Sequence, residues 1–351
     1  MILVCGERNE MTVTIKDVAK RARVAIGTVS RVINGFSDVD PRLQVRVEKA
    51  IKDLSYRPNA RAQSLTRNFS PILSFILGNR SFLHPIHSRI LHGVEEYCDE
   101  AGYLVIYTKF QYSPEIPSSE LRLPRVLHSH GIAECMILAG TNYDNFVEAL
   151  EKMRVPYVLL GNNFITQNNR ERLDQVRFDD FSGAREATEY LIQLGHRRIW
   201  YIGDTSKLWW KVMHEGYLRA MTDHGLEPLG QTVALSDDPY TNGYECIRLI
   251  LEKNYPVTAI FGIDDVVLGA WDYLTKKGQE APRDISLVGF DDLEPARLKV
   301  PPLTTVRIDN EEVGRQLAKM AIDKINFPGK RFSEVIVPTK LIKRGTCQPI
   351  E

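Results

Sequence analysis

Residues 14–34, TIKDVAKRARVAIGTVSRVIN, constrain the fold more than any other segment, because they predict two short helices joined by a tight turn. Apolar residues recur at the spacing of one buried helix face over residues 15–22 and again over 29–33. The other face of the second helix offers hydroxyl, amide and guanidinium groups, from Thr28, Ser30, Arg31 and Asn34. Such groups suit phosphates and base edges. The segment therefore predicts a helix-turn-helix whose second helix enters the major groove of double-stranded DNA.

The charge distribution supports a nucleic-acid partner although the whole chain is formally neutral. Residues 1–70 contain 13 Lys and Arg against 7 Asp and Glu, so they carry a net charge of +6 and the remainder carries −6. A basic head on an acidic body fits a small DNA-binding module attached to a larger domain. Taken alone, the charge also fits an ordinary solvated helical surface.

Length and composition limit the class of protein. A chain of 351 residues predicts two to three domains, and 43% apolar residues suffice for large cores. No run of 18 uncharged apolar residues occurs, so no membrane span is expected. The scattered cysteines contain no C-x-x-C pair and predict free thiols in a reducing cytosol, without a disulfide framework or a metal site: Cys5, Cys98, Cys135, Cys246 and Cys347.

The first 70 residues predict four segments. Residues 1–10 are expected to be a disordered extension, and residues 11–57 the DNA-binding domain, whose third helix spans 41–54 after an Asp40 N-cap. Residues 59–65 have good helix propensity but too little apolar area to be stable alone, so they fold only against a partner. We expect residues 58–69 to form a hinge and linker, and the body to begin at residue 70.

Strand and helix patterns alternate from residue 70 onward, which predicts parallel sheets with crossover helices. The strand patterns lie at 72–77, 103–107, 136–138, 157–160, 199–202, 259–261 and 286–288. The helical patterns lie at 88–101, 144–153, 182–194, 214–224, 240–253, 265–277 and 310–326. The strands are too many for one ordinary sheet, so two α/β lobes are expected. A ligand of such a fold binds beyond the carboxyl ends of the strands, here in the cleft between the lobes.

Six motifs in order resemble the lactose-repressor (LacI/GalR-type) family of bacterial transcription regulators. They are TIKDVA with VxxxTVSRVIN, RVEKAIKDLSYRPN (46–59), AxxL (62–65), LGHRRI (194–199), VGFDD (288–292) and PPLTTV (301–306). The resemblance implies a body like a periplasmic sugar-binding protein, with two Rossmann-like lobes and three crossings near residues 178, 306 and 333. The first lobe would then span about 70–178 and 307–333, and the second about 179–306 and 334–351.

The resemblance also implies which head residues contact DNA. Ile26, Gly27 and Arg31 take positions that face bases, with Arg31 able to bind guanine in a bidentate manner. Phosphate contacts are implied for a polar set: Thr14, Thr28, Ser30, Asn34 and Asn59. Residues 59–65 become a hinge helix in the minor groove, where Leu65 wedges between base pairs; a small contact with the body is the alternative for Leu65.

The chain departs from the family pattern in two head positions. Arg23 stands in the turn where relatives usually have Gly, and a non-Gly residue with positive φ costs on the order of 1 kcal/mol. Ala25 replaces the usual Ser at the N-cap of the recognition helix, a loss of roughly 1 kcal/mol. These departures predict a less stable head with the same function.

The effector site is expected near Asp291, which follows a strand end and can accept bonds from sugar hydroxyls or a base ring. Asp264 or its neighbour Asp265 faces the cleft while the other caps a helix. Trp209 and Trp210, expected in a loop, offer an aromatic face for a pyranose, with a core role for one as the alternative. Further candidates are Phe82, His84, Ile86, Asn162 and Lys211. Relatives usually carry Arg where this chain has Met213.

The sequence thus predicts an operator-binding regulator, most simply a repressor, acting as a homodimer on a pseudo-palindromic site, with a tetramer also open. Its effector is expected to be a small molecule, most simply a sugar, while a nucleobase or a protein co-regulator stays open. No catalytic residue, metal site or cofactor is expected, because no GxGxxG, P-loop or GxSxG motif is present. A pure solute-binding protein is disfavoured by the basic head.

Overall fold

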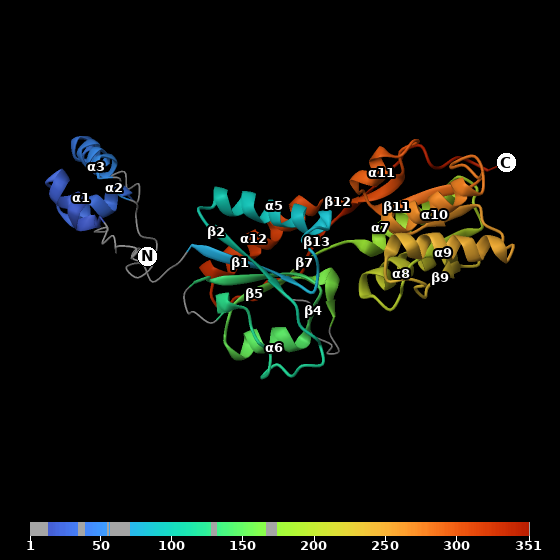
Figure 1. Cartoon of the computed structure of the whole chain (residues 1–351), viewed down its shortest axis with the longest axis horizontal. Coiled ribbons are helices and arrows are strands. Elements are labelled where there is room, and N and C mark those ends of the chain that lie inside the picture. Colours follow the sequence, from blue (N-terminus) through green and yellow to red (C-terminus); the bar gives the residue numbers. More distant parts are fainter. Residues whose placement is uncertain are drawn as a thin grey trace, which may run out of the picture. The chain divides into compact units, whose positions relative to one another are not determined.

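The computed structural model of the chain divides into two compact units, Met1–Ser70 and Pro71–Glu351, which we call the head and the body (Figure 1). It describes residues 13–33, 39–54, 56, 71–127, 132–165 and 174–350. The expected extension at residues 1–10 and the expected hinge at 58–69 lie outside these described residues.

The described part of the head contains three helices around a small apolar core, α1 (Ile15–Ala22), α2 (Ile26–Ile33) and α3 (Pro41–Asp53). Its helix ends follow the predicted capping. The Asp40 carboxylate accepts a hydrogen bond from the Arg42 N–H at 2.7 Å, as expected for the N-cap of α3. The core is formed by one face of each helix: Val18, Ala19, Ala22, Val29, Val47 and Ala50.

The turn between α1 and α2 has the left-handed backbone that relatives satisfy with Gly. Arg23 has φ 55° and ψ 50°, a conformation that costs a non-Gly residue about 1–2 kcal/mol. The Arg46 guanidinium holds this turn from α3, because its Nη2 donates to the Ala22 carbonyl at 2.6 Å and to the Arg23 carbonyl at 3.2 Å. The predicted strain at Arg23 is therefore present and is offset by a contact from the third helix.

The body contains two lobes, each built on a six-stranded sheet. In the first lobe all strands are parallel, in the order β13-β7-β5-β3-β1-β2. In the second lobe the order is β14-β12-β11-β10-β8-β9, and only β14 is antiparallel. A short parallel pair, β4 (Asn142–Tyr143) with β6 (Phe164–Ile165), lies beside the first sheet.

Seven of the twelve strands in these two sheets coincide closely with the predicted strand patterns, and the five strands that begin at residues 175, 229, 304, 335 and 339 had no predicted strand pattern. The first sheet contains β1 (Ile72–Gly78), β2 (Leu104–Phe110), β3 (Cys135–Gly140), β5 (Tyr157–Leu160), β7 (Gln175–Phe178) and β13 (Val335–Val337). The second contains β8 (Ile199–Ile202), β9 (Leu229–Gln231), β10 (Ala259–Phe261), β11 (Ser286–Asp291), β12 (Thr304–Ile308) and β14 (Thr339–Ile342).

Helices cover both faces of each sheet, which explains why the strands are apolar without a polar alternation. They are α5 (Pro85–Glu100), α6 (Asp144–Lys152), α7 (Asp180–Gln193), α8 (Leu208–Asp223), α9 (Pro239–Glu252), α10 (Asp264–Lys276), α11 (Glu294–Leu298) and α12 (Asn310–Asn326), with single 3₁₀ turns at Arg125–Leu127 and Gly161–Asn163. Figure 1 shows α5 and α12 on one side of the first sheet and α6 on the other. On β1, Phe75 belongs to the core cluster that includes residues of α5 and α12, and Ile76 to the cluster that includes residues of α6.

The helices α5 and α12 approach so closely that their contact requires glycine. A Cβ on Gly93 would collide with the Glu311 carbonyl, and one on Gly314 would collide with the Ile90 carbonyl. This contact fixes α12, which arrives from the second lobe, onto the first sheet.

The chain crosses between the lobes three times. The first crossing follows Phe178, as expected. The second follows Ile308, because β12 stays paired in the second sheet to that end, with β11 as far as Arg307 and with β14 at Ile308. The third follows Val337, because β13 pairs with β7 in the first sheet. The second and third crossings therefore lie slightly later than the expected places near 306 and 333.

Candidate functional site

The recognition helix α2 presents the expected side chains on its solvent face. Ile26 (45% exposed), Gly27 and Arg31 are exposed, and the space beside the Gly27 Cα is open. Thr28 and Ser30 are half-buried beside them, while Val29 is fully buried in the head core. The helix thus offers an apolar side chain, a bare backbone position and a guanidinium at one surface.

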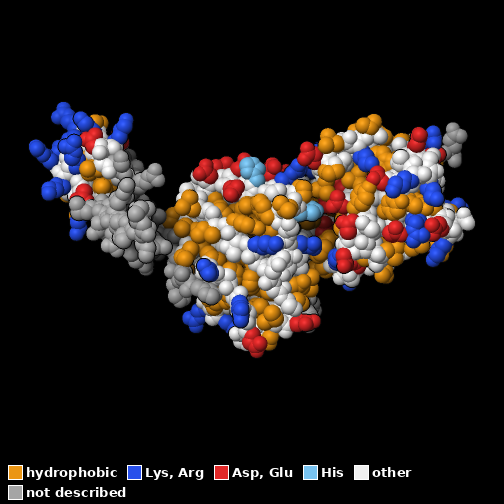
Figure 2. Space-filling view, viewed as in Figure 1, with side chains coloured by type: hydrophobic (Ala, Val, Ile, Leu, Met, Phe, Trp, Pro, Cys, Tyr) orange, Lys and Arg blue, Asp and Glu red, His pale blue; other side chains and the backbone are white. Residues whose placement is uncertain are grey.

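The start of α1 uses its polar groups locally. The Thr14 N–H and hydroxyl donate to Asp17 Oδ2 at 2.8 and 2.7 Å, so Thr14 is fixed at the helix start. Figure 2 shows Lys and Arg side chains over much of the visible face of the head. Three expected DNA contacts lie outside the described residues: Asn34, Asn59 and Leu65.

A cavity of about 410 Å³ lies between the two lobes of the body, and we call it the cleft cavity. Its wall is formed where parallel strands end and helices begin, the place where α/β sheets bind ligands. The first lobe contributes Arg80, Ser81, His84, Ile86, His87, Leu160, Asn163 and Phe178. The second contributes Asp180, Lys207, Trp209, Trp210, Met213, Asp237, Asp238, Pro239, Ile263, Asp265 and Asp291.

Five of the expected effector residues line the cleft cavity, namely His84, Ile86, Trp209, Trp210 and Asp291. Their elements differ from expectation in one respect. The sequence predicts the two tryptophans in a loop, but they lie in the first turn of α8, which begins at Leu208 after an extended Lys207. Consecutive side chains on a helix point in different directions. Trp210 is therefore only 4% exposed, whereas Trp209 is half-buried.

Two other expected residues do not line the cavity because their side chains are satisfied within the core. Asp264 is fully buried; its carboxylate accepts from the Leu293 N–H at 2.7 Å and the Thr305 hydroxyl at 2.6 Å. Asn162 donates to the Phe178 carbonyl at 2.9 Å and to Asp180 Oδ2 at 2.8 Å. Both residues position the cavity wall from behind it.

The remaining two candidates also lie off the wall. Phe82 packs against Tyr107, with ring centroids 4.9 Å apart, and Lys211 is exposed on α8. Asp265, one of the two carboxylates of which one was expected to face the cleft, lines the cavity, and so do Asn163, next to Asn162, and Lys207, four residues before Lys211.

Sequence reasoning missed Arg80 and Asp180, which follow the ends of β1 and β7. The Arg80 guanidinium lies over the Trp209 ring at 4.5 Å, and its Nε donates to the Thr141 hydroxyl at 2.9 Å. Arg80 belongs to the first lobe and Trp209 to the second, so this cation–π pair spans the cleft cavity. Because the sequence indicates only a crossing at β7, nothing in its pattern shows that the next carboxylate faces the cavity.

Burial perturbs the ionisable groups of the wall. It raises the pKa of Asp180 to about 7, and it raises the pKa of Asp291 well above the ordinary value, with Asp264, Asp265 and Asp180 adding repulsion. Burial also lowers the pKa of His87 to about 3, so this imidazole is neutral near pH 7. Perturbed groups gathered in one cleft mark a candidate functional site.

The strand end that carries Asp291 is held in an unusual backbone conformation. Asp291 has φ 109° and Asp292 has φ 53°, and such outliers cost of order 1–3 kcal/mol each. Three guanidiniums hold the buried Asp292 carboxylate: Arg307 Nε lies 2.6 Å from Oδ2, Arg297 Nη2 3.0 Å from Oδ2, and Arg344 Nη2 2.5 Å from Oδ1. These ion pairs lower the pKa of Asp292 against the opposing effect of burial. They anchor the turn that directs Asp291 toward the cavity.

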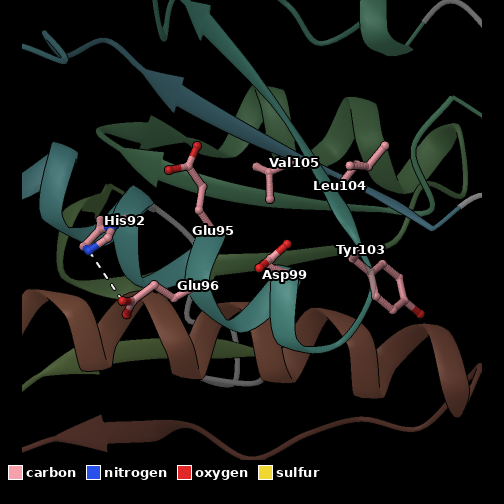
Figure 3. A pocket seen from close by; sticks show the side chains of 7 residues that line it. All are labelled: His92, Glu95, Glu96, Asp99, Tyr103, Leu104 and Val105. Atoms are coloured by element: carbon pink, nitrogen blue, oxygen red, sulfur yellow. Dashed lines mark ion pairs between the residues drawn. The ribbon is translucent and has the colours of Figure 1, made fainter.

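A second, more open hollow lies between α5 and β2 on the first lobe (Figure 3). It is lined by His92, Glu95, Glu96, Asp99, Tyr103, Leu104 and Val105. His92 Nε2 lies 3.6 Å from Glu96 Oε1, and Leu104 is 61% exposed on the edge strand.

Within the described ranges, no group of His, Cys, Asp and Glu side chains is arranged to hold a metal ion. No helix in the described part of the chain is long and apolar enough to cross a membrane.

Comparison with known proteins agrees with this architecture. The family model described as periplasmic binding proteins and sugar binding domain of LacI family matches residues 72–345. The model of bacterial regulatory proteins, lacI family, matches residues 14–59. The HTH-type transcriptional repressor PurR of Haemophilus influenzae (strain PittEE) is 31% identical over 343 residues, covering 96% of this chain and 99% of that protein. The regulator CelR of Thermobifida fusca is 30% identical over 336 residues, covering 94% and 97%.

Solved structures show the same arrangement. The lac repressor dimer bound to operator and the anti-inducer ONPF superposes with a TM-score of 0.80 at 25% identity, covering 96% of this chain and 99% of that one. A complex of the regulator CelR with cellobiose gives a TM-score of 0.67 at 27% identity, covering 95% and 99%.

The helix-turn-helix head and the two-lobed body with its cleft define a DNA-binding transcriptional regulator with a ligand-binding domain, and not an enzyme. The chain belongs to the LacI family of bacterial regulatory proteins. The predicted family and fold are confirmed.

Proposed function

We propose that this protein is a repressor whose affinity for a pseudo-palindromic operator is set by a small molecule, a sugar, in the cleft cavity. Residues 11–57 bind DNA, residues 58–69 form the hinge, and the body from residue 70 binds the effector. The cleft cavity carries this proposal. It joins two tryptophans, suited to the apolar face of a sugar ring, to carboxylates that accept hydrogen bonds from hydroxyl groups.

Coupling between ligand and operator follows from the position of the cavity. Its wall comes from both lobes, so a ligand that contacts both stabilises one lobe arrangement over others. The Arg80–Trp209 pair is one contact that such a ligand would compete with, because the guanidinium covers one face of the indole. A shift in lobe arrangement changes operator affinity only if the ligand binds the two arrangements unequally.

We further propose a homodimer that presents two heads to the two half-sites. Support comes from β2, which is the outermost strand of the first sheet among the described residues and lies beside α5 (Figure 3). Its Leu104 and Tyr107 are 61% and 40% exposed. In the second lobe Leu298 and Val300, at the end of α11 and beyond it, are 73% and 90% exposed. Exposed apolar edges of this kind mark association surfaces.

The test is selection of duplexes from a random DNA pool by the full chain, followed by binding titrations with a panel of sugars. We expect sequence-selective binding that one sugar changes, with two chains per duplex. Arg31→Ala should reduce selectivity, whereas Glu227→Gln, an exposed change in the second lobe, should not. Binding that shows no sequence preference would contradict the operator role, and a response only to a nucleobase or a protein would replace the sugar.

A further inference from the structure

The cleft cavity is lined by more carboxyl groups than cationic side chains. Asp180, Asp265 and Asp291 line it from the starts of α7 and α10 and the end of β11. Asp180 accepts one bond from the Asn162 amide, but Asp265 and Asp291 have no hydrogen bond or ion pair within the described part of the chain. Two exposed carboxylates at the rim, Asp237 and Asp238, add to the imbalance. Unpaired carboxylates in a cavity wall are costly unless a ligand supplies their partner.

The two cationic side chains of the wall are already engaged elsewhere. Arg80 donates to Thr141 and covers the Trp209 ring. Lys207 Nζ lies 3.3 Å from Asp204 Oδ2 and 5.3 Å from the centre of the Trp210 ring. Neither cation is paired with Asp265 or Asp291, so the wall does not neutralise its own carboxylates.

Buried polar groups of the wall without a protein partner are a second, independent indication of a ligand site. The Trp210 indole N–H and the His87 Nδ1 have no hydrogen-bond partner, although these side chains are only 4% and 5% exposed. His84 Nδ1 is also buried without a partner, and His84 lines the same cavity as Asp265. Such groups require a ligand that offers acceptors as well as donors. Ile86, Met213 and Ile263 add apolar surface for a ring or carbon skeleton.

We propose that the effector carries a positively charged amine that binds between Asp265 and Asp291, with hydroxyl groups that satisfy Trp210 and the histidines. An amino sugar is the simplest molecule of this class. The inference rests on the proposed function, because it names the effector of the same cavity. Since no metal-binding group of side chains occurs among the described residues, an organic cation fits better than a metal ion.

Two other classes of ligand, neutral sugars and sugar phosphates, would interact less favourably with the carboxyl groups of the wall. With a neutral sugar the carboxyl groups of Asp265 and Asp291 would have no counter-charge and would ionise only against the cost of burial, and a sugar phosphate would add negative charge beside them. An ammonium group donates charge-assisted hydrogen bonds to both carboxylates, which are roughly twice as strong as neutral ones.

The test uses the full chain and three matched sets of probes, the gluco, galacto and manno sugars as free hexose, hexosamine, N-acetylhexosamine and hexose 6-phosphate. Binding is measured by titration calorimetry, and operator affinity is measured in parallel. At least one hexosamine should bind at least about tenfold more tightly than its N-acetyl and unsubstituted partners. Asp291→Asn and Asp265→Asn should each remove most of that preference while Glu227→Gln keeps it. Asn tolerates the positive φ at residue 291, and Asp265→Asn remains informative if the first variant does not fold.

Several outcomes overturn the inference. They are equal binding of an amine and its N-acetyl partner, tighter binding of a phosphate or a neutral sugar, and no binding of any hexosamine. A neutral sugar that binds and changes operator affinity would leave the proposed function standing without this inference. A hexosamine that binds without changing operator affinity would support the inference and contradict the proposed function.

Discussion

The buried carboxylate of Asp180 contributes to the pH dependence of the stability of the body, and Asp180→Asn should remove that contribution. Burial raises the pKa of Asp180 from 3.8 to about 7, so the native state binds a proton more tightly than the unfolded chain. Stability therefore falls as pH rises between these values, and above about pH 7 the cost is about 4 kcal/mol at 1.36 kcal/mol per pKa unit. An ionised carboxylate in the first turn of α7 gains only about 0.3–1 kcal/mol from the helix dipole, so the cost of burial dominates.

The amide that Asp180→Asn introduces can keep the hydrogen bond from the Asn162 amide through its oxygen while losing the charge. Relative to the unmodified chain, the free energy of unfolding of Asp180→Asn should therefore increase by about 3 kcal/mol between about pH 5 and about pH 8. Urea unfolding followed by tryptophan fluorescence measures this, because all four tryptophans lie in the body.

Asp179→Asn provides the matched control. Asp179 caps α7 by accepting from the Ser182 N–H at 3.0 Å, and Asn caps helices as well as Asp does. The control should show the same pH profile as the unmodified chain. Parallel profiles for Asp180→Asn and the unmodified chain, or a variant that is less stable at about pH 8, would refute the reasoning.

Three further predictions concern the head and hinge. Arg31→Ala should cost about 1–3 kcal/mol of base discrimination at one operator position; unchanged selectivity in a binding-site selection would remove Arg31 from direct readout. Leu65→Ala should weaken specific binding while leaving salt-driven nonspecific binding nearly intact, as measured by titrations at several salt concentrations, and equal losses in both would reject the wedge. Arg23→Gly should stabilise the head by about 1 kcal/mol, because Gly adopts φ 55° without a steric penalty. Amide hydrogen exchange in α1 and α2 should then be slower in the variant than in the unmodified chain, and exchange that is no slower would show that the turn is unstrained.

Much of the fold was predictable because burial on both faces leaves continuous apolar runs in the sequence. β5, β8 and β10 have the predicted bounds. The short strands near the crossings were harder, since β13 contains only Val335–Val337 and its side chains follow no distinct pattern. Which sheet it joins depends on pairing with β7, a contact between segments far apart in the chain.

The sequence predicted which strand ends form the candidate site, but it did not predict which side chains there face the cavity. The sequence indicates that Asp264 and Asp265 follow β10, yet only the packing of Asp264 against Thr305 and Leu293 leaves Asp265 to face the cavity. In the same way, Asn162 is held by hydrogen bonds within the core, whereas Asn163 lines the cavity. Neighbouring residues with equal chemistry point to different sides, and the direction is set by tertiary contacts that a single sequence does not reveal.

The most direct test of the account is the affinity of the full chain for a selected operator, measured with and without a saturating ligand that binds the body. Linkage between the cleft cavity and the head predicts a change of about 5–150-fold in operator affinity, and the same factor in ligand affinity when operator is present. A ligand that binds the cavity and leaves operator affinity unchanged would contradict the claim that this cavity controls the head.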